Sequence, residues 1–237
     1  MKKTVSALAA VFVIAAALLL LPGPLSKAPA GIEIEQKEIV EVPMYTAIDM
    51  SIPLSLSDMK KDADLILLGS FTGKTLDEEK QLDPRRPDID TDRSFEFMID
   101  KVVFGDYPQK NIEVVQSHEY TWTFRDYAGG KNYPVLVPDP LYSDPDMTAK
   151  HLIFLKHVNG SDAHYRPCGE PWDIAIDGSG LLRSDSIVFA SNEPADRDAY
   201  LETDKKIYHF IFTTTKGVYE DFITGRTLED ALAELKD

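Results

Sequence analysis

The chain has 237 residues and a formal net charge of -15, a length that suffices for one globular domain with a substantial core. The acidic balance argues against nucleic acid as a partner and against docking on anionic lipid, because both depend on clustered Lys and Arg. Cys168 is the only cysteine, which excludes an intramolecular disulfide, so the domain has to be stabilised by its core.

The first thirty residues have the features of an export segment. Lys2 and Lys3 precede an apolar run from Thr4 to Leu21, and Ala28-Pro29-Ala30 offers the small residues of a cleavage site. At about 1.5 Å per residue the run reaches about 27 Å, close to the thickness of a hydrocarbon core. An uncleaved transmembrane helix is therefore as well supported as a cleaved signal peptide. Both alternatives place the body outside the cytoplasm, either secreted or anchored by one N-terminal transmembrane helix.

The body of the chain contains many short segments with strand character. Alternating or short apolar runs predict strands at residues 65–71, 94–104, 112–124, 151–158, 172–176, 186–190 and 207–215. The polar residues 75–93 and the acidic residues 191–204 are expected to be loops. Thr227 and Asp230 form a capping box, which predicts a closing helix up to Lys236.

These elements predict a mainly β protein. The expected fold is an OB-like Greek-key barrel of five to seven strands with a short C-terminal helix, preceded by the N-terminal apolar helix. We expect a signal peptide or membrane anchor over 1–30, a tether over 31–54, the β-barrel domain over 55–190, and a C-terminal strand and helix extension over 191–237. A β-sandwich has the same number of strands and is the alternative topology.

Four core motifs occur in an order that resembles a known framework. They are Ala63–Gly69 (ADLILLG), Phe95–Gly105 (FEFMIDKVVFG), Ile112-x-Val114 and Ala149–Leu155 (AKHLIFL). Their order resembles netrin-like, metalloprotease-inhibitor-like modules and a diffuse group of uncharacterised surface proteins of Gram-positive bacteria. The resemblance covers about residues 60–190 and implies a five-stranded OB-type barrel. Inhibitors of that family engage the protease zinc through an N-terminal cysteine, which this chain lacks, so no functional residue is transferred.

An aromatic segment is the candidate binding surface. Strand periodicity places Tyr120, Trp122 and Phe124 on one face, and Tyr127 follows shortly after. OB-type barrels bind ligands on a strand face and on the adjoining loops. The alternative is that the stripe fills the core, which is the commoner role of such side chains.

Three aspartates imitate the start of a calcium loop. Asp88, Asp90 and Asp92 have the right spacing, but the positions where an EF-hand requires Gly and Glu hold other residues. A looser calcium site is the alternative to a solvated acidic loop. No histidine spacing matches a metal-binding motif. We therefore expect neither a metal nor a cofactor.

Three functional classes remain open. The first is a binding or interaction module on the cell surface, whose partner would be an extracellular protein or a cell-envelope component. The second is an inhibitor of an extracellular protease, which the resemblance alone suggests. The third is a hydrolase with an unrecognised site. We expect a module without catalysis, because the sequence has no recognisable nucleophile beside a base and no three convergent metal ligands.

Overall fold

The computed structural model describes residues 37–47, 52–81, 89–127, 129–158, 165–189, 197–215 and 219–236. All of them belong to one compact unit, Lys37–Asp237. Strands dominate and helices are short, which confirms the expected mainly β class and the C-terminal helix. No helix within the described ranges has the length and apolar character of a membrane span. The expected N-terminal helix lies outside these ranges.

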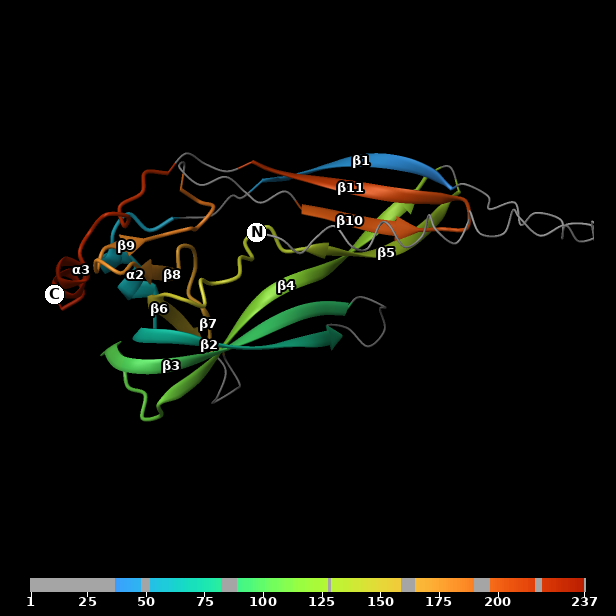
Figure 1. Ribbon diagram of the computed structural model, residues 1–237. Helices are drawn as coiled ribbons and strands as arrows, with labels where there is room; N and C mark the ends of the chain where they lie inside the picture. Colours follow the sequence, from blue (N-terminus) through green and yellow to red (C-terminus); the bar gives the residue numbers. More distant parts are fainter. Residues whose placement is uncertain are drawn as a thin grey trace, which may run out of the picture. The chain divides into compact units, whose positions relative to one another are not determined.

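The described residues form two β-sheets and two short helices (Figure 1). In chain order the elements are β1 (Glu38–Ala47), α2 (Leu56–Asp62), β2 (Leu65–Gln81), β3 (Ile89–Phe104), β4 (Asn111–Asp126), β5 (Lys131–Pro138), β6 (Lys150–His157), β7 (Tyr165–Pro167), β8 (Asp173–Ile176), β9 (Leu182–Arg183), β10 (Arg197–Glu202), β11 (Lys206–Thr215) and α3 (Leu228–Glu234).

The smaller sheet has the order β1-β11-β10. Strand β1 lies in the segment 31–54, which the sequence predicts to be a tether, and pairs in parallel with β11 from Glu38↔Lys206 to Ala47↔Thr215. Strand β10 lies in the predicted acidic loop and pairs with β11 in antiparallel fashion. Both segments contribute to the sheet because their alternate apolar side chains, such as Val40 on β1, pack against its inner cluster.

The larger sheet has eight strands, in the order β2-β3-β4-β7-β6-β8-β9 with β5 paired to β4. Strand β2 also pairs with β6, so the pairings β2–β3–β4–β7–β6–β2 follow one another in a ring. The contact between β4 and β7 consists of a single pair, Val114↔Tyr165. The barrel is therefore not closed by continuous ladders.

Most of the predicted polar loop 75–93 is in fact a hairpin. Strand β2 extends to Gln81 and β3 begins at Ile89. This hairpin is stabilised by pairs of opposite charge and not by buried apolar side chains. Asp77 lies opposite Arg93 in the register, and the Arg93 Nε donates to Asp77 Oδ1 at 2.5 Å. Opposite charges facing each other across an antiparallel pair stabilise it modestly.

The space between β2, β3, β4 and β6 is filled by aromatic and branched side chains. Phe71 contacts Phe95 and Phe97 edge to face, with ring centroids 5.9 and 4.9 Å apart. Ile153 and Trp172 are buried in the same cluster. Apolar residues therefore recur at every second position because successive side chains of a strand point alternately into this core and out of it. This alternation fixes the register of the strands.

The two helices pack on the other side of β6. Leu56 and Met59 of α2 share a buried cluster with Phe154 of β6, Phe189, and Ala231 of α3. Each helix begins with a side-chain cap, as the sequence predicts for α3, where the Thr227 Oγ1 accepts from the backbone N–H of Asp230 at 3.1 Å.

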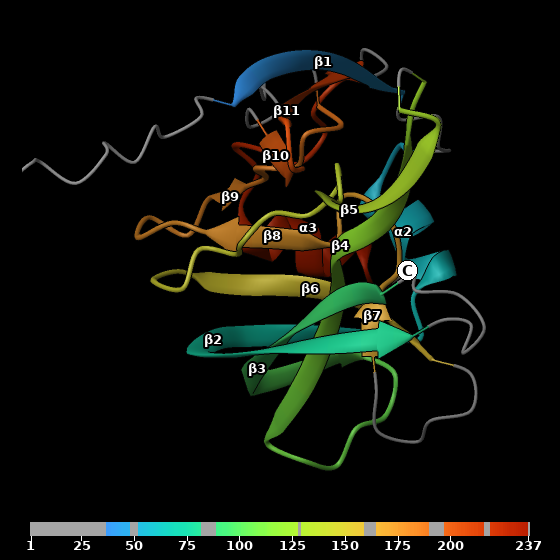
Figure 2. The ribbon, with the colours of Figure 1, turned by 90° about the vertical axis from the view of Figure 1, so that its right-hand side faces the viewer.

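Strand β4 belongs to two cores. Its residues Asn111–Glu119 pair with β3, and Glu119–Asp126 pair with β5 (Figure 2). The three-stranded sheet packs on this second half through a cluster that includes Val135, Val137 and Phe210. One continuous strand therefore contributes both to the core between β2, β3, β4 and β6 and to the cluster beneath the three-stranded sheet.

Candidate functional site

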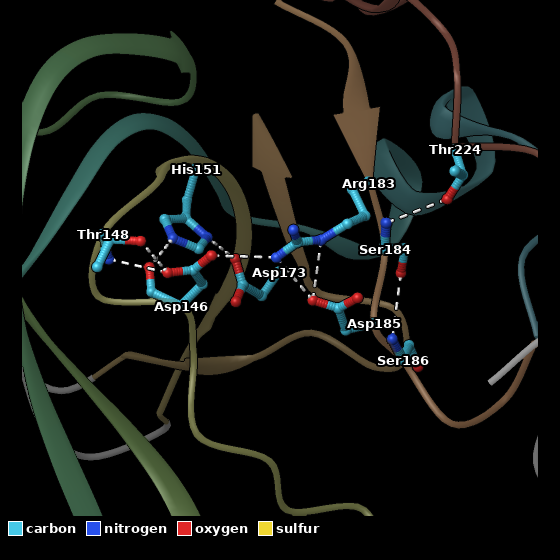
Figure 3. Close-up of polar contacts among 9 residues, drawn as sticks. All are labelled: Asp146, Thr148, His151, Asp173, Arg183, Ser184, Asp185, Ser186 and Thr224. Carbon is cyan, nitrogen blue, oxygen red and sulfur yellow. Dashed lines mark hydrogen bonds and ion pairs between the residues drawn. The ribbon is translucent and has the colours of Figure 1, made fainter. Parts of the chain in front are cut away.

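A buried histidine lies at the start of β6. The Nδ1 of His151 lies 2.6 Å from Oδ1 of Asp173, the first residue of β8, and its Nε2 lies 2.7 Å from the backbone oxygen of Asp146 (Figure 3). A carbonyl oxygen can only accept, so Nε2 carries a proton. The imidazole is therefore fixed at both nitrogens.

Burial and hydrogen bonding have opposite effects on His151. Burial, the largest single effect, disfavours the charged imidazolium, but the hydrogen bonds and charges of Asp173 and Asp146 together outweigh it, so the pKa of His151 is raised above its ordinary value. The pair shares one proton, either as imidazolium and carboxylate or as imidazole and carboxylic acid, and is neutral overall in both forms.

Acidic and basic side chains surround this pair and bind one another. Asp146 accepts hydrogen bonds from the backbone N–H and the hydroxyl of Thr148 at 2.9 and 2.6 Å, and these bonds lower the pKa of Asp146 to about 2. Arg183 donates to Asp146 and to Asp185, both at 3.1 Å (Figure 3). These charges are already paired, so we assign them a structural role.

Glu170 is the most unusual ionisable group of the described residues. Glu170 lies between Gly169 and Pro171 in the chain, and the residue is only 9% exposed. Burial raises the pKa of Glu170 to about 8, although the hydrogen bond from the hydroxyl of Ser186 favours the ionised form. At neutral pH this carboxyl group is therefore mainly protonated and uncharged.

Glu170 lies between two hollows. One, of about 50 Å³, is shared with His151 and Asp173. The other, of about 220 Å³, also adjoins Gln116 of β4 and Arg166 of β7, and we call it the Glu170 hollow. Its apolar walls come from Val115, Leu141, Tyr142 and Pro167.

Gln116 is the second unusual group of the Glu170 hollow. The residue is 7% exposed, and its side-chain oxygen Oε1 is buried without a hydrogen-bond partner. Leaving a buried acceptor unpaired costs about 1–3 kcal/mol. Two other buried side-chain atoms of the described residues, Nδ1 of His118 and Nε2 of His209, also have no hydrogen-bond partner. Of the three residues only Gln116 lines the Glu170 hollow, which makes this hollow the candidate position for a ligand that supplies the missing donor.

Arg166 has a fixed partner in the protein. Its guanidinium donates to the carboxylate of Asp92, which is almost fully buried and is also bound by Lys80. The guanidinium of Arg166 therefore has a carboxylate partner before any ligand enters the hollow, although it shares this single carboxylate with Lys80.

A larger hollow, of about 560 Å³, lies on β2, β3 and β4. One of its two carboxylates, Glu96, accepts from Thr72, Lys74 and Asn111, and the other, Glu113, is exposed to water. None of the buried unpartnered side-chain atoms of the described residues lines this hollow. The Glu170 hollow is the stronger candidate, since an apolar pocket with a few convergent polar groups is the usual form of a binding site.

Comparisons with protein-family models, with curated proteins and with solved structures find no match to this chain. The functional argument therefore rests on the contacts, burial and charge of its own residues.

The predicted aromatic surface lies mainly between the two sheets. Tyr120, Trp122 and Phe124 are half-buried and pack on the cluster beneath the three-stranded sheet. The rings of Trp122 and Phe210 are 5.9 Å apart, in an edge-to-face contact. Tyr127 is 85% exposed. This placement favours the alternative that the stripe fills a core.

The three aspartates of the predicted calcium site have different surroundings. Asp88 lies outside the described residues. Asp90 accepts from the backbone N–H of Thr121 at 3.0 Å, and Asp92 binds two basic side chains. Within the described ranges no group of three or more His, Cys, Asp or Glu has an arrangement that could hold a metal ion.

Sequence reasoning did not identify Glu170 and Gln116. The segment Arg166–Trp172 drew attention only to Cys168, whose thiol has a pKa raised by burial to about 12 and is therefore a poor nucleophile. The sequence does contain a hint that Glu170 is buried, since this residue directly precedes Pro171 and the predicted strand 172–176. Gln116 gave no signal, because the absence of its partner is visible only in three dimensions.

Proposed function

We infer that this protein is an exported or membrane-anchored surface protein of a bacterium that acts as a binding or interaction module. The N-terminal run Thr4–Leu21 supports export. The partner would be an extracellular protein or a cell-envelope component. The strongly acidic composition argues against nucleic acid.

An OB-like barrel is the fold we propose for the part that binds. Strands β2, β3, β4, β6 and β7 pair in the order β2–β3–β4–β7–β6–β2, with β4 and β7 parallel. This order supports a partly open Greek-key barrel of OB type. Such barrels commonly present strand faces and loops to partners, which agrees with a binding role.

The observation that carries the proposal is the Glu170 hollow. It combines apolar walls with the unpartnered oxygen of Gln116 and the buried carboxyl group of Glu170. An unsatisfied buried acceptor destabilises the free protein, and a ligand with a matching donor would remove that cost. The geometry thus provides a reason for binding that a purely structural role does not.

Photo-crosslinking on intact cells tests the proposal. A photoreactive residue is placed at Leu141, on the wall of the hollow, or at Leu181, which does not line it. We expect an adduct on the full chain from position 141 and none from position 181, and we expect Gln116→Leu to remove it. Equal labelling at both positions, or a chain that fractionates with the cytosol, would overturn the proposal.

A hydrolase is the second candidate, favoured by one contact. The Ser186 hydroxyl donates to Glu170, and above about pH 8, where Glu170 is ionised, the carboxylate could act as a base for attack of this serine on an ester. Turnover of generic ester, peptide or glycoside substrates that is lost in Ser186→Ala would support this function. Protease inhibition follows from the resemblance alone, and a panel of extracellular proteases tests it.

A further inference from the structure

The chemistry of the Glu170 hollow indicates what it would bind, if the proposed function holds. We propose that the hollow recognises an uncharged amide, either a backbone peptide group or a carboxamide side chain of a partner polypeptide, through the carboxamide of Gln116. A short apolar side chain next to that amide would pack against Val115, Leu141 and Pro167.

The unpaired polar atom of the hollow belongs to a side-chain amide. The oxygen Oε1 of Gln116 is buried and has no donor. A carboxamide offers an oxygen acceptor and an N–H donor side by side, and its natural complement is another amide, which offers the same two groups in reverse. Rotation of the Gln116 amide by half a turn exchanges the two positions, and a peptide group still matches them.

The charges at the hollow also restrict the ligand. Arg166 is bound by Asp92, and the carboxyl oxygen Oδ1 of Asp139 accepts from the backbone N–H of Leu141 at 2.8 Å. Glu170 is uncharged at neutral pH because of its burial. A charged ligand would lose its hydration between the apolar walls, where Gln116 and the protonated Glu170 offer it no opposite charge. A neutral amide avoids that cost.

The size of the hollow restricts the ligand further. The volume of about 220 Å³ is below the range of about 300–1,000 Å³ typical of pockets for drug-sized molecules. It suits a fragment comparable to one amino-acid residue. The apolar walls supply affinity for the side chain, and the amide supplies orientation.

Four small probes of matched shape test this proposal. They are N-isobutylacetamide, isobutyl acetate, isobutylammonium and isovalerate, titrated into the isotope-labelled full chain in micelles and followed by NMR. We expect N-isobutylacetamide to shift the signals of Gln116 and Leu141 and to bind at least about tenfold tighter than the ester, which lacks the N–H donor. The two ions are expected to bind more weakly still.

The variant Gln116→Leu supplies a second readout. Replacing an unsatisfied buried amide by an apolar group of similar size should abolish the preference for the amide over the ester and raise the denaturation midpoint. Gln109→Leu changes an exposed glutamine and should alter neither. A lowered midpoint for Gln116→Leu would mean that the amide has a partner in the protein, which would overturn the proposal.

The outcomes separate this proposal from the proposed function. If an ion or the ester binds in the hollow as tightly as the amide, the ligand class is wrong, whereas the binding site stands. If no probe shifts Gln116 or Leu141 and no crosslink forms from position 141, both proposals fail together.

Discussion

The imidazole Nδ1 of His151 lies 2.6 Å from Oδ1 of Asp173, and the imidazole is fully buried. His151 is the second residue of β6 and Asp173 is the first residue of β8, and the two strands are antiparallel neighbours. The other ring nitrogen of His151, Nε2, donates a hydrogen bond to the backbone oxygen of Asp146. One buried side chain therefore connects the segment before β6 to the β6–β8 ladder.

Loss of the imidazole should destabilise the domain strongly. In His151→Leu the carboxyl group of Asp173 and the carbonyl oxygen of Asp146 lose their partner, and breaking a buried pair costs about 3–5 kcal/mol. Asp173→Asn retains a hydrogen bond to the ring and should cost about 1 kcal/mol. Urea denaturation of both variants checks this, and equal losses would contradict the assigned network.

Glu170 should make stability depend on pH. Its pKa is raised from 4.5 to about 8 in the folded protein, so the folded state retains a proton that the unfolded state loses. The contribution is fully present below about pH 4.5 and is lost as the pH rises to about 8, with a total of up to about 5 kcal/mol.

Glu170→Gln isolates this effect, because the amide cannot ionise and still accepts from Ser186. The free energy of unfolding of the wild type, relative to this variant, should fall between pH 5 and pH 8. Glu113→Gln changes an exposed residue and serves as the control. Parallel pH profiles of the wild type and Glu170→Gln would show that Glu170 is ionised when folded.

Trp122 should behave as a core residue. Its ring contacts Phe210 and Phe124 at centroid distances of 5.9 and 6.0 Å. Because it is half-buried, Trp122→Ala should cost about 2–3 kcal/mol, below the range for fully buried aromatic residues. Tyr127→Ala, at a position that is 85% exposed, should change stability by less than about 0.5 kcal/mol. Thermal denaturation compares the stability of the two variants. If Trp122→Ala does not lower stability, Trp122 again becomes a candidate for the binding surface.

Gly69 is required where β2 and β3 approach closely. A Cβ at this position would lie 2.0 Å from the backbone oxygen of Met98 and 2.7 Å from the ring of Phe97. Gly69→Ala should therefore cost more than about 3 kcal/mol, since backbone must move. Gly178→Ala meets no atom within 4 Å and should be neutral. Expression and circular dichroism of the two variants test the close approach of β2 and β3, and a well-folded Gly69→Ala would contradict it.

The sequence predicts the strands of the larger sheet well where apolar and polar residues alternate, but residues 186–189 of the predicted strand 186–190 form a buried turn with an isolated bridge at Phe189. Phe95 and Phe97 alternate with polar residues. Both phenylalanines can be buried on one face only if this segment is a strand, so the spacing predicts one. The hairpin between Asp77 and Arg93 was not predicted, because its strands are held by cross-strand charges that composition cannot distinguish from a solvated loop. Strand β1 was missed since its partner, β11, lies more than 150 residues later in the chain.

The sequence by itself determined the mainly β class of this protein, and its export signal stays a prediction. Periodicity and capping are local properties, so the mainly β composition and the helix after Thr227 could be inferred from neighbouring residues. Only the tertiary structure decided where Trp122 packs and that Gln116 and Glu170 adjoin one hollow. These features depend on burial and on partners that are absent or distant in sequence, and no local pattern encodes them.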